Sequence, residues 1–483
     1  MIQRQYLPGR MFAAAIGAIE QLSEGLVEPP LRRLDEVLAD EQLLEAVLGR
    51  LAQRWPHSRT RGRPGTPAEV VLRLLVLKRL KGWSFDETER EVRASVVYRY
   101  LVRVYFEPVP DAKTLIRLSG VIGVAGVEAI HRCLLGRAKE QGLIKGRRAR
   151  VDTTVVETNI SYSTDSGLLA DGVRVLTRAL QRIEQATGVV GQKLRNHKRA
   201  STRRVLEISR AARSRKLKDR RARLQAGYRR LLAVVRATVH DAKRVMAELA
   251  QGARVAVGQH AGQIVTRAQA QLRQLLPLVQ RVITQTRARI VGGDKHYHDK
   301  VFSLFEPHTE AIRTGKASKP TEFGQLVKLQ EAEHQFVVDY QVYPRRPDDR
   351  SLAIPSVETH QRIFGRPPYL LAADRGFWSA RNKQAAHSAG VTKVCIPALG
   401  KLSAAQRAEQ HQRWFRCGQG VRAGCEGRIS VMKRRDGLAR CLYRGPDGMQ
   451  YWVGWGVVSN NLWVLITADR PWHKQPPRAQ QPS

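Results

Sequence analysis

The stretch from about residue 175 to residue 290 most constrains what this chain can fold into. It contains one aromatic residue, Tyr228, among many Arg, Gln, Ala and Leu residues. Leu217, Leu224 and Leu231 recur every seven residues, which predicts long amphipathic helices and is compatible with a coiled-coil hairpin. Because aromatic residues dominate many cores, their scarcity argues against a compact core here. We expect a helical insertion that contacts DNA or a second protomer, or serves as a solvated spacer.

The charge of the chain indicates an anionic partner. Lys and Arg number 83 against 43 Asp and Glu, a formal net charge of +40. Such a surface repels itself unless a polyanion lies against it, so nucleic acid is the expected partner and an anionic membrane the weaker alternative. Residues 191–230 carry a local net charge of +14. This run is either a solvated helix face or a contact with phosphates. The residues expected to contact DNA here are Arg203, Arg204, Arg220 and Arg221.

Length and cysteine usage limit the class of protein. A chain of 483 residues with 42% hydrophobic residues can bury two to four cores and is not wholly disordered. Its five cysteines show no Cys-x-x-Cys spacing, which argues against disulfides. No histidine sits among Cys417, Cys425 and Cys441 at ligand spacing, which argues against a zinc site there. The apolar run 11–19 continues into a helical pattern and is interpreted as a helix, not an export signal. We expect a cytoplasmic, nucleoid-associated protein.

Residues 1–145 show helical patterns throughout. Thr66-Pro67-Ala68-Glu69 has the form of a capping box, and after Gly82 a second helix is capped by Ser84. Two short helices around a glycine turn predict a helix-turn-helix-like unit near 66–95 that binds DNA, with an ordinary helical hairpin as the alternative. Upstream, Arg61 and Arg63 could enter a narrow minor groove, or belong to a basic linker.

Strands and helices alternate in the remaining sequence. A β-branched run at 149–156 predicts a buried strand, and further strands are expected at 323–329, 335–343, 369–373 and 393–396. Helices fit 352–364, 379–389 and the segment around Glu426. This alternation predicts a mixed α/β sheet formed by residues 146–174 and 291–466. The Pro- and Gln-rich tail, 467–483, is expected to be disordered.

Three carboxylates stand out by their positions. Asp152 lies within the first strand, Asp374 follows a later apolar strand, and Glu426 is on a predicted helix. A carboxylate in an apolar strand is costly unless a cation pairs with it, so an arginine partner is the simplest explanation for each. A pair of divalent metal ions about 3.5–4 Å apart would explain all three together.

The helix around Glu426 places two cations beside it. Arg422, Glu426 and Lys433 share one helical face at about 100° per residue. This arrangement is either a surface salt-bridge ladder or a metal ligand with phosphate-binding neighbours. The spacing alone does not distinguish the two.

Other residues compete for the same roles. Glu157, Asp165 and Asp171 are alternatives for the first acid, although Glu157 is expected on the opposite strand face from Asp152 because their separation is odd. A second cluster with metal-ligand chemistry lies outside these acids. It consists of Asp294, His296, His298 and Asp299.

The motifs together resemble a known family, the bacterial insertion-sequence transposases of the DDE class, in particular the insertion-sequence-five-like and ISNCY groups. The resemblance extends from about residue 60 to residue 465, and its motifs occur in the expected order. They are Gly62-Arg63-Pro64, Thr66-Pro67-Ala68-Glu69, Leu77-Lys78-Arg79-Leu80, Gly82-Trp83-Ser84, Val151-Asp152-Thr153-Thr154, Gly315-Lys316, Lys319-Pro320-Thr321-Glu322, Ala373-Asp374-Arg375-Gly376-Phe377, and Arg422-x3-Glu426-x6-Lys433. One position departs from the signature, because Gln419 stands where related families have tyrosine.

The resemblance implies an RNase H-like catalytic domain. It implies that Asp152, Asp374 and Glu426 bind two Mg²⁺ ions, for which Mn²⁺ can substitute, and that Arg422, Lys433, Lys316 and Lys319 contact DNA. The implied activity is cutting of double-stranded DNA at the ends of a mobile element and joining of the 3′-hydroxyl ends to target DNA, by a homodimer or higher homo-oligomer. A metal-dependent nuclease or resolvase, and a non-catalytic DNA-binding protein, remain as alternatives.

Overall fold

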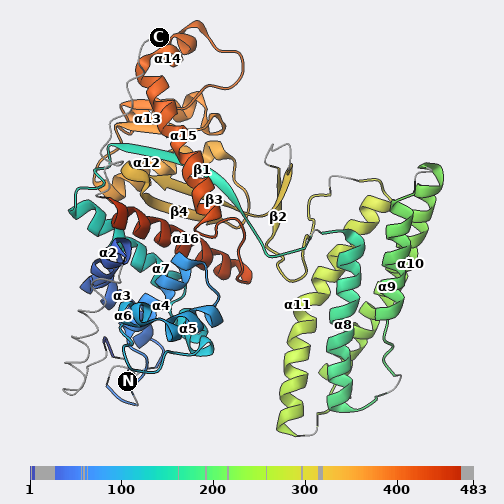
Figure 1. The fold of residues 1–483 in the computed structure, drawn as a ribbon. Coiled ribbons are helices and arrows are strands. Elements are labelled where there is room, and N and C mark those ends of the chain that lie inside the picture. The colour runs from blue at the N-terminus through green and yellow to red at the C-terminus, as the bar shows by residue number, and fades with distance from the viewer. Residues whose placement is uncertain are drawn as a thin grey trace. The chain divides into compact units, whose positions relative to one another are not determined.

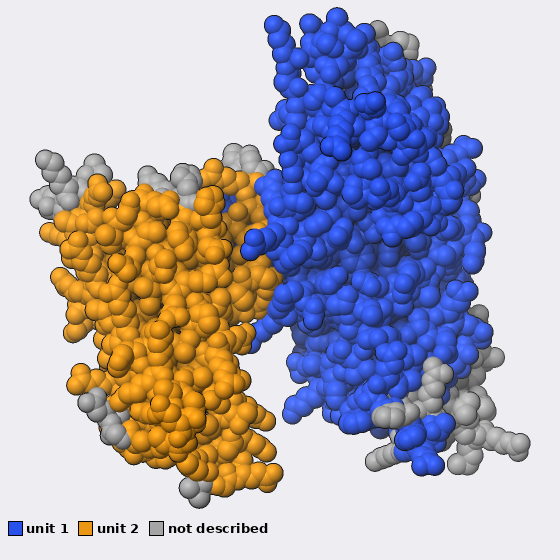
Figure 2. Space-filling model, turned by 180° about the vertical axis from the view of Figure 1, so that it is seen from behind, with its two compact units in different colours: residues 1–159, 317–483 blue, residues 160–316 orange. Residues whose placement is uncertain are grey.

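The computed structural model divides the chain into two compact units, residues 1–159 with 317–483 and residues 160–316 (Figure 2). It describes the chain except for residues 2, 6–27, 56, 58–59, 63, 162, 191–192, 215–216, 257, 295–296, 314–318 and 469–483, and the side chains of 217–219. The run 11–19, Arg63, His296, Lys316, the side chain of Leu217 and nearly all of the tail 467–483 therefore lie outside the described residues.

The N-terminal part of the first unit is helical, as the sequence predicts. Its helices are α2 (Pro29–Leu38), α3 (Glu41–Ala52), α4 (Ala68–Lys81), α5 (Phe85–Ala94), α6 (Val96–Leu101) and α7 (Ala112–Glu140). Helix α7 is long and apolar enough to cross a membrane by length and composition, but it packs against α3 and α16 (Gly445–Thr467). This packing is that of a core helix in a folded unit.

The two helix starts near 66–95 differ from each other. The predicted capping box at Thr66 is wrong: α4 begins after Pro67, and no side chain caps it. Backbone carbonyls of Gln3 and Arg4 accept the first N–H groups of α4 instead. The prediction at Ser84 is confirmed, because Ser84 and Glu87 form both bonds of a capping box. Gly82, at φ 71°, makes the left-handed turn between the helices.

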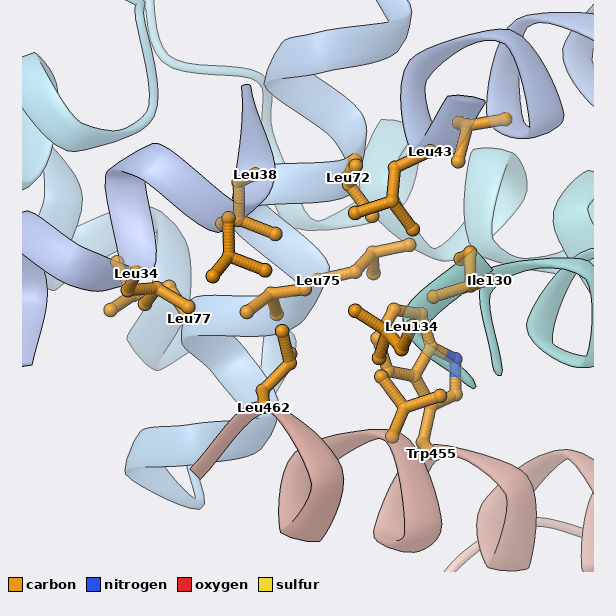
Figure 3. Packing of buried hydrophobic residues seen from close by; sticks show 14 of the residues in the cluster. Leu34, Leu38, Leu43, Leu72, Leu75, Leu77, Ile130, Leu134, Trp455 and Leu462 are labelled. Atoms are coloured by element: carbon orange, nitrogen blue, oxygen red, sulfur yellow. The ribbon is translucent and has the colours of Figure 1, made fainter. Parts of the chain in front are cut away.

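Helix α16 is an element that the sequence analysis does not identify. Nearly all of its residues are buried, and it packs against α2, α4, α7 and β4 (Val337–Tyr343). Figure 3 shows Trp455 and Leu462 of α16 pointing toward leucines of α2 and α4 and toward Leu134 of α7. Because α16 contacts both the helices and the sheet, these parts share one unit.

The sheet of the first unit is mixed. Its remaining strands are β1 (Arg148–Glu157), β3 (Thr321–Glu331), β5 (Leu370–Ala373) and β6 (Lys393–Cys395). Strand β1 pairs antiparallel with β3 and β3 antiparallel with β4, while β1 pairs parallel with β5 and β5 parallel with β6. The order within this unit is therefore β4-β3-β1-β5-β6, of which Figure 1 labels β4, β3 and β1. The predicted mixed α/β class is confirmed.

Helices cover both faces of this sheet. Val151 and Ala373 point to the face that packs on α12 (Ala353–Phe364) and α13 (Ala380–Ser388). Ala372 and Cys395 point to the opposite face and pack on Phe415 of α15 (Arg413–Arg434), which follows α14 (Ala404–His411). Because side chains alternate along a strand, even-numbered residues of β1 and β5 near this point face α15.

The second unit is a helical bundle with its own core. It contains α8 (Asp165–Thr187), α9 (Lys198–Ala212), α10 (Leu217–Ala250), α11 (Gln259–Ile290) and the short strand β2 (Glu310–Arg313). The expectation that few aromatics preclude a compact core is wrong, because Leu, Val and Ile side chains from all four helices form one. Leu231 is fully buried in it and Leu224 packs against it. Leu224 and Leu231 of the leucine repeat thus face the interior of the bundle.

Candidate active site

Two carboxylates follow the last paired residues of two parallel strands. The register pairs Val151 of β1 with Ala373 of β5, and the next residues are Asp152 and Asp374. Asp152 accepts a hydrogen bond from the N–H of Thr153 at 2.7 Å. Asp374 follows β5 directly and accepts a hydrogen bond from the N–H of Gly376 at 2.8 Å, at the start of a short 3-10 helix. The sheet register therefore places the two acids side by side in sequence-distant strands.

Glu426 lies on the helix that covers the same sheet face. Helix α15 packs against β1, β5 and β6. Nη1 of Arg422 lies 2.6 Å from Oε1 of Glu426, one helical turn away, and the Glu426 side chain is 60% exposed. The predicted sharing of one face by Arg422 and Glu426 is confirmed. Their contact is an ion pair of the kind that the salt-bridge interpretation required.

The three acids share one electrostatic environment. Burial, together with the carboxylates of Asp374 and Glu426, raises the pKa of Asp152 to about 7, although the N–H of Thr153 and the guanidinium of Arg422 act to lower it. Like charges near one another disfavour ionisation unless a cation lies between them. A divalent cation bound between these carboxylates would relieve their mutual repulsion.

The described residues contain no group of three or more His, Cys, Asp or Glu side chains gathered closely enough to hold a metal ion. Glu426 is instead paired with Arg422 in this structure. The donor chemistry nevertheless fits a hard cation, because three carboxylates without thiol or imidazole are the ligands that Mg²⁺ and Mn²⁺ prefer. Asp152 also retains an unfavourable charge environment that a cation would neutralise.

The raised pKa of Asp152 predicts a pH-dependent stability difference. Between pH 4 and pH 7 the folded chain binds a proton that the unfolded chain releases, so stability falls as pH rises through this window. Asp152→Asn removes the titrating group and therefore this fall in stability with pH. We expect it to stabilise the protein at pH 8, by up to about 4 kcal/mol, and to change little at pH 4. Thermal unfolding at both pH values measures the effect, and an equal change at both would contradict it.

Asp349 is an acid near this site that the sequence analysis misses. It begins the 3-10 helix Asp349–Leu352, and its Oδ1 lies 3.4 Å from Oγ1 of Thr153. A Cβ built on Gly376 would lie 3.0 Å from Asp374 and 3.3 Å from Asp349, which places both carboxylates against this glycine. Burial raises the pKa of Asp349 and the Asp374 carboxylate adds to the rise. No spacing rule connects Asp349 to the other acids, since only the loop after β4 brings it there.

The other acids considered from the sequence have cationic partners. Glu157, at the end of β1, pairs with Lys319 and with Arg440, so Lys319 lies beside this acid. In the second unit, Asp165 lies 2.9 Å from Arg289 and Asp171 lies 2.7 Å from Arg174. These contacts give each acid a structural role.

The remaining predicted site residues are dispersed. Lys433 lies on α15 with its Nζ 4.0 Å from Glu322, and Arg61 is exposed in the turn before α4. Asp299 pairs with Arg281 at 3.3 Å, while His296 lies outside the described residues, so the structure does not describe the 294–299 cluster as a whole. Gln419, at the departure from the family signature, donates to the backbone carbonyl of Cys395 at 3.3 Å.

The helices near 66–95 present little basic surface. Helix α4 is buried along almost its whole length. On α5, acidic residues outnumber basic ones. They are Asp86, Glu87, Glu89 and Glu91 against Arg90 and Arg93. Since phosphates repel acidic side chains, this composition favours the helical-hairpin interpretation of α5, and DNA binding by this segment stays a prediction.

A buried ion pair fastens α15 to the sheet. Nε of Arg150 on β1 lies 2.8 Å from Glu331 on β3, and Nη1 donates to the carbonyl of Val421 on α15 at 3.0 Å. A Cβ on Gly424 would lie 2.6 Å from this guanidinium, so glycine lets α15 approach it. The thiol of Cys425 donates to Glu331 at 3.2 Å. These contacts fix the turn of α15 that carries Glu426.

Breaking this pair is expected to be strongly destabilising. Arg150→Met leaves the fully buried carboxylate of Glu331 without its cation, which should lower the free energy of unfolding by about 3–5 kcal/mol. The double variant Arg150→Met/Glu331→Leu removes both charges and should recover most of this loss. Chemical denaturation measures both, and a double variant no more stable than the single one would contradict the account.

Comparison with known families adds an independent observation. A family model described as Transposase domain (DUF772) matches residues 20–119, which include helices α2 to α6 and the start of α7. The match supports a transposase. A transposase acts on DNA, in agreement with the net charge of +40. Comparisons with curated proteins and with solved structures give no match. The acids on β1, β5 and α15 lie outside the matched segment.

Proposed function

We propose that this protein is a DDE-type transposase that cuts DNA at the ends of an insertion sequence and joins the 3′-hydroxyl ends to target DNA. The observation that carries the proposal is the placement of Asp152 and Asp374 after paired residues of adjacent parallel strands, with Glu426 on the helix packed against them. The transposase-domain match at 20–119 supports the reaction class. The strand order, three antiparallel strands followed by two parallel ones, supports an RNase H-like catalytic domain.

In this proposal Asp152, Asp374 and Glu426 hold two Mg²⁺ ions, for which Mn²⁺ can substitute. When bound, such a pair supplies activation of the attacking oxygen and charge stabilisation of the leaving oxygen. Asp152 acts from within β1 and Asp374 from the end of β5, and at both positions a backbone N–H group already orients the carboxylate. Glu426 would release Arg422 when it binds the metal. Arg422 would then be available to a phosphate near the cut, because its side chain lies on the same helix turn.

Lys433 and Lys319 are placed in this proposal at the edge of the DNA path. Both are held by glutamates, at Glu322 and Glu157, which fixes their long side chains before DNA arrives. The phosphates of a DNA backbone can bind these lysines together with the glutamates, or can replace the glutamates as their partners. The sequence-based proposals for Lys316 and Arg63 concern residues outside the described ones, and Arg61 stays a proposed minor-groove contact. Pairing of two DNA ends calls for a homodimer or higher homo-oligomer.

The test combines cleavage with strand joining. The purified protein is incubated with Mg²⁺ and with duplexes that carry the sequences flanking its own gene, together with a supercoiled target plasmid. A transposase nicks the duplex at one fixed position and links its 3′ end to the plasmid. Fixed nicks without joined products would instead identify a nuclease or resolvase. Mg²⁺-independent binding with no cleavage would identify a non-catalytic DNA-binding protein.

A further inference from the structure

The helical bundle of the second unit contains a recess lined by arginines. It lies between α9 and α10, has a volume of about 340 Å³, and is bordered by Arg210 of α9 and by Arg223 and Arg230 of α10. Small residues complete its lining. They are Ala211, Ala226 and Gly227. Guanidinium groups from two helices thus surround a hollow that small side chains leave open.

Among the described residues that line this recess, Glu207 is the only carboxylate, and it is already neutralised. Glu207 accepts from Nη1 of Arg204 at 2.6 and 2.9 Å, and Nη1 of Arg230 lies 3.5 Å from its second oxygen. The Arg204 side chain holds the pKa of Glu207 below its ordinary range. Because one carboxylate faces several guanidiniums, the recess keeps a net positive charge.

Close packing of the two helices gives the recess its shape. A Cβ built on Gly227 would lie 2.9 Å from Cγ1 of Ile208, so only glycine allows this approach of α10 to α9. Ile208 is buried in the core of the bundle. The arginines therefore project from two helices that are fixed to each other. Binding of an anion then costs less backbone ordering than it would between two helices that move independently.

We propose that this recess, the α9–α10 arginine cleft, is a binding site for backbone phosphates of double-stranded DNA. Planar guanidiniums bind phosphate oxygens through paired N–H donors, and neighbouring arginines of a cleft can hold one phosphate from several directions. Arg203 and Arg204 of α9 and Arg229 of α10 extend the positive surface beside it. Contacts to phosphates carry no sequence information directly, so the cleft should grip DNA independently of sequence. In this proposal the bundle binds duplex DNA through a unit other than the one that carries the three carboxylates.

The leucine repeat supports DNA over a second protomer as the ligand of this unit. Leu231 is fully buried and Leu224 partly buried within the core of the bundle itself. These side chains are therefore not available to form an apolar seam with another copy. What the described part of α9 and α10 offers to a partner is chiefly charge.

The test uses the full-length protein and two matched triple variants. Arg210→Gln, Arg223→Gln and Arg230→Gln remove the three positive charges that line the cleft. The control, Arg236→Gln, Arg267→Gln and Arg273→Gln, removes the same charge from exposed positions of α10 and α11 that do not line the cleft. Binding to a random-sequence duplex is measured at several salt concentrations. Thermal unfolding of each variant verifies that the bundle is folded.

The cleft variant should bind at least about tenfold more weakly at 100 mM salt, with a salt slope smaller by about 2–3, and the control should stay near the parent. In a second experiment, DNA should protect Arg210, Arg223 and Arg230 of the parent from phenylglyoxal. Equal weakening in both variants, or no protection at the cleft, would overturn the proposal. The proposal rests on DNA as the substrate but not on cleavage, because absent cleavage with intact cleft binding would refute only the catalytic proposal.

Discussion

Asp152→Asn, Asp374→Asn and Glu426→Gln are each expected to reduce DNA cleavage by at least about a thousandfold while leaving DNA binding intact. Each substitution keeps the size of the side chain and removes one carboxylate. Loss of a metal ligand removes several kcal/mol of charge stabilisation in the transition state, which corresponds to three or more decades in rate. Cleavage of a labelled element end under single-turnover conditions measures this effect.

The matched control is Glu157→Gln. Glu157 lies on the same strand as Asp152 but pairs with Lys319 and Arg440. This variant should keep cleavage within about tenfold of the parent, because its carboxylate serves the ion pairs and not the reaction. Near-parental cleavage by any of the three acid variants would remove that residue from the proposed site.

DNA affinity is expected to fall by about 10³–10⁵ between 50 and 200 mM salt, if about six to ten phosphates are neutralised. The net charge of +40 and the run of arginines at 191–230 are the source of this dependence. Each lysine or arginine that contacts a phosphate releases condensed counterions, and added salt opposes that release. Fluorescence anisotropy with a labelled duplex measures the slope.

Asp152→Asn serves as the control for the salt measurement. It leaves every lysine and arginine in place, so its salt slope should equal that of the parent. A nearly flat salt profile for the parent would show that the excess positive charge does not serve DNA binding.

The order of elements around the acids could be predicted from the sequence because it depends on local patterns. The β-branched run around Val151 and the apolar run before Asp374 both form strands, and the helix with Glu426 forms where its pattern indicates. The alternation of side chains along β1 places Glu157 and Asp152 on opposite faces of the strand, as predicted. These features depend on nearest-neighbour sterics and on side-chain alternation, which a single sequence displays.

Features that depend on contacts between distant segments were not predictable. Helix α16 lacks an obvious polar face because it is buried between the N-terminal helices and the sheet. Asp349 reaches the site through a loop, and Arg150 interrupts an apolar strand because it pairs with Glu331 across the sheet. The bundle forms its core almost entirely from aliphatic residues, with Tyr228 as the one aromatic side chain of the described cluster, and the scarcity of aromatics obscured this core. In each case tertiary packing decided the outcome.

Mapping of the metal site on the polypeptide tests the central claim most directly. Fe²⁺ is added in place of Mg²⁺, and ascorbate with peroxide then generates hydroxyl radicals that cleave the chain near the bound ion. The account predicts chain cleavage close to Asp152, Asp374 and Glu426 together, suppressed by excess Mg²⁺ and lost in Asp152→Asn. Cleavage at other positions, or the same pattern in Asp152→Asn, would contradict the claim that these three carboxylates form one metal site.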